Sequence, residues 1–179
     1  QCTIGGKYVL QRHEFTYHNP TTVAIDVDDL MPEEELRTRI LKIEQFSYNY
    51  IGRNLTLNAI AIRSVSGDPA AFTKTVRTVL GTTTLPLILC SLDPVVMEAG
   101  LAETREHHPL IYAATEKNWK PMADLALAFD VPLVVHTDGD LAVLRSLVKT
   151  LNACGLADLV LDPCTLAEDG LSDTIHALT

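Results

Sequence analysis

Residues 86–104 read PLILCSLDPVVMEAGLAET, and this stretch shows how most of the chain is organised. An apolar run at 87–91 is followed by a polar corner and then by a longer stretch that suits a helix. A short run with few polar residues predicts a strand that is buried on both faces. Asp93 and Pro94 predict a helix start, because Asp caps the first amides and Pro fits the first turn. The stretch therefore predicts a β-strand, a short loop and an α-helix.

The same order of strand, loop and helix recurs along the chain. Strands are expected at 23–27, 59–63, 87–91, 110–114, 133–137 and 159–162, and helices at 32–48, 69–80, 94–104, 117–129 and 140–153. Asp68 and Asp140 are expected to cap two of these helices as Asp93 caps another. Strands and helices that alternate in this way form βαβ crossovers and a parallel sheet. The predicted fold class is therefore α/β.

The number of units leaves two architectures open. Six βα units exceed the five strands of a flavodoxin-like sheet and fall short of a closed (β/α)8 barrel, which needs about 250 residues. Residues 23–179 are either an open six-stranded sheet or a TIM-type barrel present only in part. Residues 1–22 alternate apolar and polar side chains, which predicts a short N-terminal β-ribbon that caps the main fold.

Composition narrows the possible functions. The 179 residues carry a net charge of −9, which argues against nucleic acid as a partner. The apolar runs are far shorter than the roughly 20 residues that cross a membrane, so no membrane partner is expected. The four cysteines form no C-x-x-C pair and are too few for a disulfide framework, so we expect a cytoplasmic protein with no metal site in this segment. Because the chain begins at Gln1, it is expected to be a piece of a longer polypeptide.

Functional side chains of parallel α/β folds gather where the strands end and the loops begin. The candidates at these positions are Asp26, Arg63, Ser91, Asp93, Asn118, His136 and Asp162. A structural role is the favoured interpretation for several of them, with Asp93 as a helix cap and Asp26 as the ion-pair partner of Arg63. Histidine titrates near neutral pH in general, but no nucleophile motif accompanies His136. The residues by themselves therefore predict a functional face but no mechanism.

Several strings of the chain resemble one protein family over essentially the whole length. They are YVLQRHEFTYHNP at 8–20, VAIDVDD at 23–29, SGDP at 66–69, PLILCSLDP at 86–94, PLIYAATEKNW at 109–119 and LVLDP at 159–163. The family that they resemble is the large (gamma) subunit of the corrinoid iron–sulfur protein of carbon monoxide dehydrogenase/acetyl-CoA synthase. The resemblance implies that the chain is most of a central (β/α)8 barrel, and that a [4Fe–4S] domain and a corrinoid-binding domain lie outside it.

The resemblance also implies what the parent subunit does. The family carries a methyl group between methyl-tetrahydropterin and the nickel–iron cluster that assembles acetyl-CoA, so the parent complex acts as a methyltransferase. The cobalt of a corrinoid (cobalamin) is the carrier, and the [4Fe–4S] cluster keeps it reducible; this segment is expected to bind neither cofactor. The implied partners are the small subunit, which has a similar barrel, and transiently acetyl-CoA synthase and the methyltransferase.

A more distant likeness concerns the pterin-binding barrels of methyltetrahydrofolate–corrinoid methyltransferases. Those barrels carry an Asp in an I-D-S/T string and an Asn in a later I-N-S string, and both side chains bind the pterin ring. The corresponding strings here are LCS at 89–91 and IYA at 111–113, so Cys90 replaces the Asp and Tyr112 replaces the Asn. A thiol is a poor acceptor for the ring N–H groups, and a phenol ring fills the space of the pterin. A degenerate pterin site is therefore expected.

Three functional hypotheses follow from these observations. The favoured one is a non-catalytic barrel that serves as a scaffold and docking module in a methyl-carrying complex. The second is an active pterin-dependent methyltransferase, in which Arg63, Asp93 and Asn118 rebuild the pocket. The third is an unrelated barrel of the aldolase or isomerase type, which would need a phosphate site in the loops of the seventh and eighth units.

Overall fold

The computed structural model describes residues 22–164, in which strands and helices alternate. The strands are β1 (Ala24–Asp28), β2 (Ser47–Tyr50), β3 (Arg53–Thr56), β4 (Ala59–Arg63), β5 (Leu87–Cys90), β6 (Leu110–Ala114), β7 (Leu133–His136) and β8 (Leu159–Asp162). The helices are α1 (Glu33–Gln45), α2 (Pro69–Leu80), α3 (Pro94–Glu103), α4 (Trp119–Phe129) and α5 (Leu141–Ala153). The longest of these helices have 13 residues, and none is long and apolar enough to cross a membrane.

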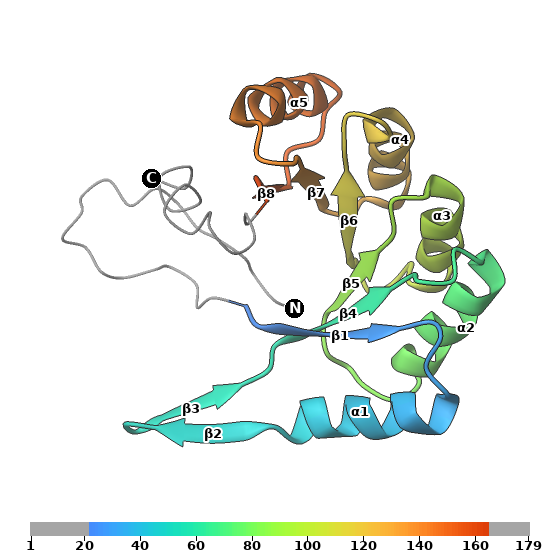
Figure 1. Cartoon of the computed structure of the whole chain (residues 1–179), viewed down its shortest axis with the longest axis vertical. Coiled ribbons are helices and arrows are strands. Elements are labelled where there is room, and N and C mark those ends of the chain that lie inside the picture. Colours follow the sequence, from blue (N-terminus) through green and yellow to red (C-terminus); the bar gives the residue numbers. More distant parts are fainter. Residues whose placement is uncertain (1–21, 165–179) are drawn as a thin grey trace.

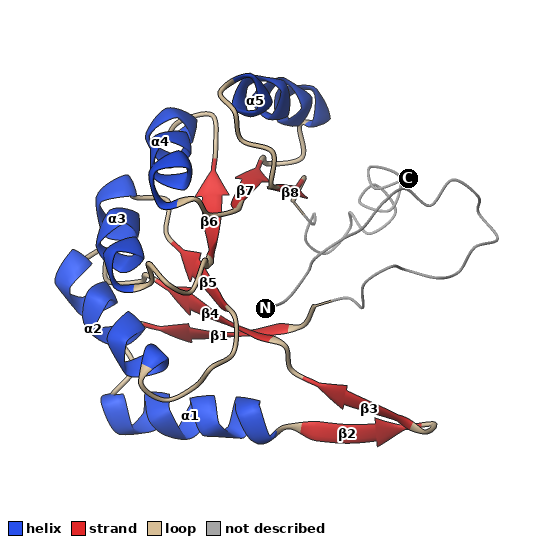
Figure 2. Ribbon diagram, turned by 180° about the vertical axis from the view of Figure 1, so that it is seen from behind, coloured by secondary structure: helices blue, strands red, loops and turns tan. Residues whose placement is uncertain are grey.

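Six of the strands form one parallel sheet in the order β1-β4-β5-β6-β7-β8. The sheet is curved, and the helices α1 to α5 follow one another along its outer side (Figure 1 and Figure 2). This arrangement is consistent with a TIM-type barrel that is present in part. The predicted α/β fold is therefore confirmed, and the six strands of the sheet lie within one residue of their predicted positions.

The hydrophobic core lies between the sheet and the helices. Alternate strand residues such as Ile60, Leu89 and Ile111 point to the helices and are fully buried. Helices α2 and α3 pack closely, and a Cβ atom added at Gly100 would lie only 2.5 Å from the ring of Phe72. Because the core takes one set of alternate residues, the other set lies on the concave side of the sheet.

The predicted helix caps are confirmed. The carboxylate of Asp68 accepts hydrogen bonds from Ala70 N at 3.0 Å and Ala71 N at 3.3 Å. Asp93 accepts from the amide of the second residue of α3 at 2.8 Å, and Asp140 accepts from the second and third amides of α5 at 2.8 and 3.0 Å. Each cap satisfies amides that have no partner within the helix, which places the helix starts where the sequence predicts them.

The predicted helix at 32–48 is wrong at its C-terminal end. The helix α1 stops at Gln45, and residues 47–56 form an antiparallel hairpin of β2 and β3. The two-residue loop between the strands consists of Ile51 and Gly52. Both have positive φ (48° and 77°), as the tight turn of such a loop requires. Apolar Tyr48 and Tyr50 alternate with polar neighbours, and this period of two favours a strand over a helix.

The expected β-ribbon falls on residues 1–22, of which all but Thr22 lie outside the described residues. The division of the chain at residue 22 therefore stays a prediction. At the other edge of the sheet, Leu161 of β8 is exposed on the side that the core occupies elsewhere. Among residues 22–164 no helix follows β8, so no described helix covers this side chain.

Candidate functional site

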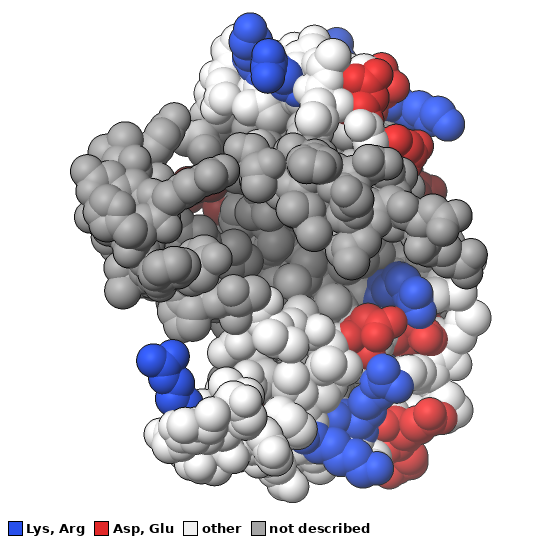
Figure 3. All heavy atoms as spheres, turned by 60° about the vertical axis from the view of Figure 1, so that its left-hand side comes forward, with Lys and Arg blue, Asp and Glu red and all other residues white. Residues whose placement is uncertain are grey.

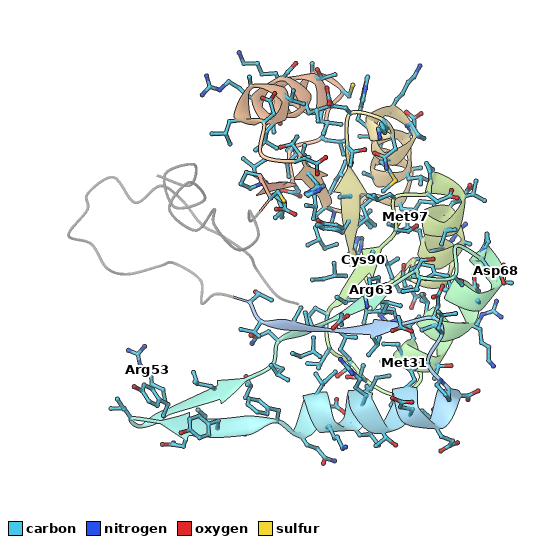
Figure 4. The ribbon with its side chains drawn as sticks, viewed as in Figure 1. Met31, Arg53, Arg63, Asp68, Cys90 and Met97 are labelled. Carbon is cyan, nitrogen blue, oxygen red and sulfur yellow. The ribbon has the colours of Figure 1, made fainter. Side chains whose placement is uncertain are left out.

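The concave side of the sheet carries a row of polar side chains at the carboxyl ends of the strands. Register pairs Asp28 with Arg63, Arg63 with Cys90, and Cys90 with Tyr112 across β1, β4, β5 and β6. On the next two strands, His136 pairs with Asp162. Figure 4 shows Arg63 and Cys90 near each other on adjacent strands. The structure therefore brings together most of the strand-end residues that the sequence selects.

Three of these side chains form a hydrogen-bonded cluster, which we call the Tyr-His-Asp cluster (Tyr112, His136 and Asp162). The Tyr112 hydroxyl donates to Asp162 Oδ2 at 2.8 Å, and His136 Nδ1 lies 3.0 Å from the same oxygen. The Tyr112 hydroxyl lies 3.4 Å from His136 Nδ1, and the ring centroids are 5.7 Å apart. The cluster joins β6, β7 and β8, so its polar groups hold neighbouring strands together.

The other ring nitrogen of His136 faces the loop that follows β7. His136 Nε2 lies 3.5 Å from Oδ1 of Asp138, whose side chain is fully exposed. The imidazole thus lies between two carboxylates, those of Asp138 and Asp162.

The predicted ion pair between Asp26 and Arg63 is confirmed, but it is not buried. Arg63 Nη2 lies 3.2 Å from Asp26 Oδ2, and Arg39 Nη2 of α1 lies 3.6 Å from Asp26 Oδ1. The side chains of Asp26 and Arg63 are 53% and 55% exposed, because they lie on the concave side rather than in the core. An exposed ion pair contributes roughly 0–1 kcal/mol to stability. The pair of Asp26 and Arg63 therefore adds little to the stability of the fold.

Cys90 and Tyr112, the two positions at which the sequence predicts a degenerate pterin site, are both held in their neutral forms. Burial raises the pKa of the Cys90 thiol to about 11, although the charge of Arg63 acts in the opposite direction. Burial also raises the pKa of Tyr112, and its hydrogen bond to the Asp162 carboxylate raises it further. Near neutral pH, position 90 therefore presents an S–H group and position 112 a hydroxyl that is already bonded to a carboxylate.

Asn118 fastens the loop after β6. Its Oδ1 accepts from Thr115 N at 2.6 Å and from Thr115 Oγ1 at 2.9 Å. Its Nδ2 donates to the carbonyls of Leu92 at 2.8 Å and Ala113 at 3.1 Å. The side chain is buried and uses both amide hydrogens and both lone pairs of its oxygen. Asn118 thus joins the loop after β6 to the loop after β5.

Ser91 and Asp93 have local structural partners. The Ser91 hydroxyl accepts from the Asp93 amide at 3.2 Å and lies 3.4 Å from the Asp93 carbonyl. The Asp93 carboxylate caps α3 through Val95 N. Both residues therefore shape the turn from β5 to α3.

Asp29 has a role that its position after β1 does not reveal. Its carboxylate accepts four hydrogen bonds from the loop after β4, at 2.8 Å from Val65 N, 3.0 Å from Ser66 N, 2.6 Å from Ser66 Oγ and 3.2 Å from Ser64 Oγ. Burial would raise the pKa of Asp29, but the hydrogen bonds from Ser66, Val65 and Ser64 outweigh it and hold the pKa below its ordinary value. The only sequence signal is the hydroxyl pair at Ser64 and Ser66, which becomes meaningful once β1 and β4 are known to be neighbours.

The described residues do not fit a metal cluster. Residues 22–164 contain no group of three His, Cys, Asp or Glu side chains that could hold a metal ion. The three cysteines in this range lie on different parts of the fold, on β5, after α5 and after β8. An iron–sulfur cluster is held by several cysteine thiolates, whereas these cysteines belong to no group of three metal-ligating side chains within residues 22–164. Residues 22–164 therefore offer no ligand set for an iron–sulfur cluster.

Two surface grooves lie on the helix side of the molecule. The larger, about 580 Å³, is lined by residues of α1, α2 and α3, including Glu33, Lys74 and Arg77. The smaller, about 170 Å³, is lined by Trp119, Val143 and Leu147 among others. Neither groove contains a residue of the polar row on the concave side, so neither extends the candidate site.

Together these features define an α/β barrel domain, present in part, whose strand-end polar residues are mostly bonded to one another. Its parallel strands, outer helices and short capped loops are those of a TIM-type barrel.

Comparison with known proteins then identifies the family. The model of the CdhD family, described as CO dehydrogenase/acetyl-CoA synthase delta subunit, matches residues 1–179, and the chain belongs to this family. This finding confirms the resemblance recognised in the sequence.

Curated relatives agree with this assignment, although they are named as gamma or large subunits. The acetyl-CoA decarbonylase/synthase complex subunit gamma 2 of Methanosarcina mazei is 45% identical over 174 residues, which are 97% of this chain and 37% of that protein. The gamma subunit of Methanothermobacter thermautotrophicus is 38% identical over 175 residues, 98% of this chain and 38% of that protein. The corrinoid/iron–sulfur protein large subunit of Moorella thermoacetica is 38% identical over 160 residues, 89% of this chain and 36% of that protein. The chain therefore spans little more than a third of these relatives.

Proposed function

We propose that this chain is the central barrel of a corrinoid iron–sulfur protein large subunit and serves there as a non-catalytic scaffold. The parent subunit carries methyl groups between methyl-tetrahydropterin and the acetyl-CoA synthase cluster in the cytoplasm. Its corrinoid and its [4Fe–4S] cluster are held by parts of the subunit outside this chain. The names of the relatives, which include acetyl-CoA decarbonylase/synthase gamma subunits and a corrinoid/iron–sulfur protein, support this assignment.

The observation that carries the scaffold role is the state of Cys90 and Tyr112. A pterin ring offers N–H groups that need acceptors, and the related barrels supply a carboxylate and an amide. Here one position holds a neutral thiol, and the hydroxyl at the other is bonded to Asp162 at 2.8 Å. Leaving ring donors without acceptors costs about 1–3 kcal/mol for each group, so this site disfavours pterin.

The rival function is a pterin site rebuilt from Arg63, Asp93 and Asn118, and the contacts of these residues argue against it. Asn118 has no hydrogen-bonding group left, because all four are used within the loops. Asp93 caps α3, and Arg63 pairs with Asp26. A ligand would have to break these contacts before it could use the same groups.

The scaffold role implies a set of protein partners. They are the small subunit of the corrinoid iron–sulfur protein and, transiently, acetyl-CoA synthase and the methyltransferase that supplies the methyl group. In this proposal the barrel binds and positions these proteins, and the cofactor chemistry takes place on other domains.

Calorimetric titration of methyltetrahydrofolate into the chain tests the proposal. The methylated tetrahydropterin ring without its tail serves as a second ligand, because the ring is the part that the related barrels bind. Calorimetry is preferred to fluorescence, since the single tryptophan, Trp119, lines the groove beside α5 on the helix side. We expect no saturable binding of either ligand.

Binding that is lost in Arg63→Ala and kept in Arg53→Ala would overturn the proposal. The two variants remove the same charge, and only Arg63 lies on the concave side of the sheet. Binding with that pattern would show that the barrel handles the methyl donor itself.

A further inference from the structure

The hairpin of β2 and β3 separates its side chains cleanly between two faces. Register pairs Tyr48 with Leu55 and Tyr50 with Arg53, so these four side chains share one face, which we call the tyrosine face. Ser47, Asn49, Asn54 and Thr56 occupy the other face. Asn49 Nδ2 donates to Asn54 Oδ1 across the polar face at 2.8 Å. An amphipathic pair of strands of this kind normally packs its apolar face against something.

No described part of the barrel covers the tyrosine face. Tyr48 and Tyr50 are each 57% exposed, and Leu55 is 49% exposed. At the two ends of the face, Ile51 in the turn is 83% exposed and Phe46 is 47% exposed. Single exposed apolar residues are ordinary, but five of them within residues 46–55 form a cluster of the kind that marks an interaction site.

The hairpin stands away from the body of the barrel. Figure 1 shows it extending from the end of α1 beyond the curved sheet, and Figure 4 places Arg53 far out on it. Among residues 22–164, β2 and β3 form a sheet of their own with no third strand. A hairpin of two strands is marginally stable alone in water, so the structure leaves it without the packing that would stabilise it.

The composition of the hairpin indicates the chemistry of what it binds. Tyrosine and arginine are enriched in the buried centres of protein interfaces, whereas Lys, Asp and Glu are depleted there. Arg53 is the single charged residue in 46–56, and none of the ion pairs within residues 22–164 involves it. In Figure 3 the lower left of the described surface is mostly white and uncharged, whereas charged side chains gather at the lower right.

We propose that the tyrosine face docks onto another protein subunit, at an apolar patch bordered by carboxylates that pair with Arg53. This inference rests on the proposed function only in that the chain works within a complex of several subunits. The hairpin leads into the amino end of β4, and the Tyr-His-Asp cluster lies at the carboxyl ends of the strands. Docking through the hairpin therefore leaves the carboxyl end of the barrel free for other contacts.

Site-specific photocrosslinking tests the proposal in the assembled complex. The photoreactive amino acid p-benzoylphenylalanine replaces Tyr50 in one sample and Asn49, on the polar face, in a matched control. We expect position 50 to crosslink to a peptide of another subunit that contains apolar and acidic residues, and position 49 to give much less of this product. Crosslinks from position 50 only to residues 1–21, only to a second copy of this chain, or to nothing would overturn the proposal.

Affinity measurements give an independent readout with the subunit that the crosslink identifies. The double variant Tyr48→Ser/Tyr50→Ser is expected to weaken binding about tenfold or more, as loss of central interface tyrosines does. Arg53→Glu is expected to weaken binding as well, and Asn49→Ser to leave it unchanged. Unchanged affinity in both the double variant and Arg53→Glu, with circular dichroism spectra like that of the parent chain, would overturn the proposal.

Two separate measurements, subunit affinity and pterin calorimetry, distinguish this inference from the proposed function. Saturable pterin binding on the concave side would overturn the scaffold role and leave the docking of the hairpin intact. Loss of hairpin docking would leave the absence of a pterin site unaffected.

Discussion

The carboxyl end of the barrel and the hairpin differ in how far their side chains are already partnered. At the carboxyl end, Asn118, Asp29 and Tyr112 bond to other groups of the same chain. On the hairpin, Tyr48 and Tyr50 are largely exposed to solvent and contribute little to the barrel. The position that usually holds an active site in this fold is thus occupied by internal contacts, whereas no other part of residues 22–164 covers the tyrosine face of the hairpin.

This difference shows why residue type and position are weak evidence for function by themselves. A row of Arg, Cys, Tyr, His and Asp at strand ends resembles a reactive site in any α/β barrel. A polar group whose hydrogen bonds are all made within its own fold can bind a ligand only after those internal hydrogen bonds break. The comparison therefore predicts that substitutions at the carboxyl end change stability, and that substitutions on the hairpin change association.

The largest effect is expected for Asn118→Ala. The change leaves buried amide and carbonyl groups of the two loops without partners, so the free energy of unfolding should fall by about 3 kcal/mol. Urea denaturation followed by circular dichroism measures the loss. Lys117→Ala, at an exposed neighbouring position, serves as the control and should stay within about 0.5 kcal/mol of the parent chain. If Asn118→Ala were as stable as its control, Asn118 would be free to bind a ligand after all.

A smaller loss, about 2 kcal/mol near neutral pH, is expected for Asp29→Asn, because the hydrogen bonds that it weakens are made to a charged group. The folded pKa of Asp29 is lowered, so its ionised form stabilises the fold above the ordinary aspartate pKa. This contribution disappears as the pH falls through the lower, folded pKa.

Denaturation curves from about pH 7 down to about pH 3 should therefore show the stability difference between Asp29→Asn and the parent chain narrowing toward the acid end. Asp124→Asn removes an exposed carboxylate on α4 and is the matched control, with little expected change at any pH. A difference between Asp29→Asn and the parent chain that stays constant down to acid pH would contradict the role of the charge.

Tyr112→Phe should cost about 1 kcal/mol, since it removes the hydroxyl that donates to Asp162 and keeps the ring. Tyr48→Phe makes the same chemical change on the exposed hairpin and should cost almost nothing. Thermal unfolding of the two variants in parallel compares the two regions directly. Equal melting temperatures of the two variants would show that the Tyr-His-Asp cluster does not stabilise the contact between β6, β7 and β8.

The smallest change in stability is expected for Tyr50→Ser, within about 0.5 kcal/mol of the parent chain, because the ring is already exposed. Chemical denaturation of the isolated chain measures it. A loss well above 1 kcal/mol would show that another part of this chain covers the tyrosine face, and would argue against docking to a separate subunit.

Local features of the chain were readable without a structure. Asp68, Asp93 and Asp140 each cap a helix through amides two or three residues away, so neighbouring residues suffice to predict the helix starts. The apolar runs predicted the strands, because a strand that is buried between helices has few polar residues. The sequence pattern does not single out the hairpin, because Tyr48 fits both the helical spacing of the preceding segment and the alternation of a strand.

The family and the α/β fold were therefore determined by the sequence, through local patterns and through strings shared with relatives. The roles of the strand-end residues were decided only by the tertiary structure. Asp162 meets Tyr112 across 50 residues, and Asn118 reaches the carbonyl of Leu92 across 26. Whether a polar side chain is free or already bonded depends on which strands become neighbours and on which face each side chain lies, and no local pattern records either.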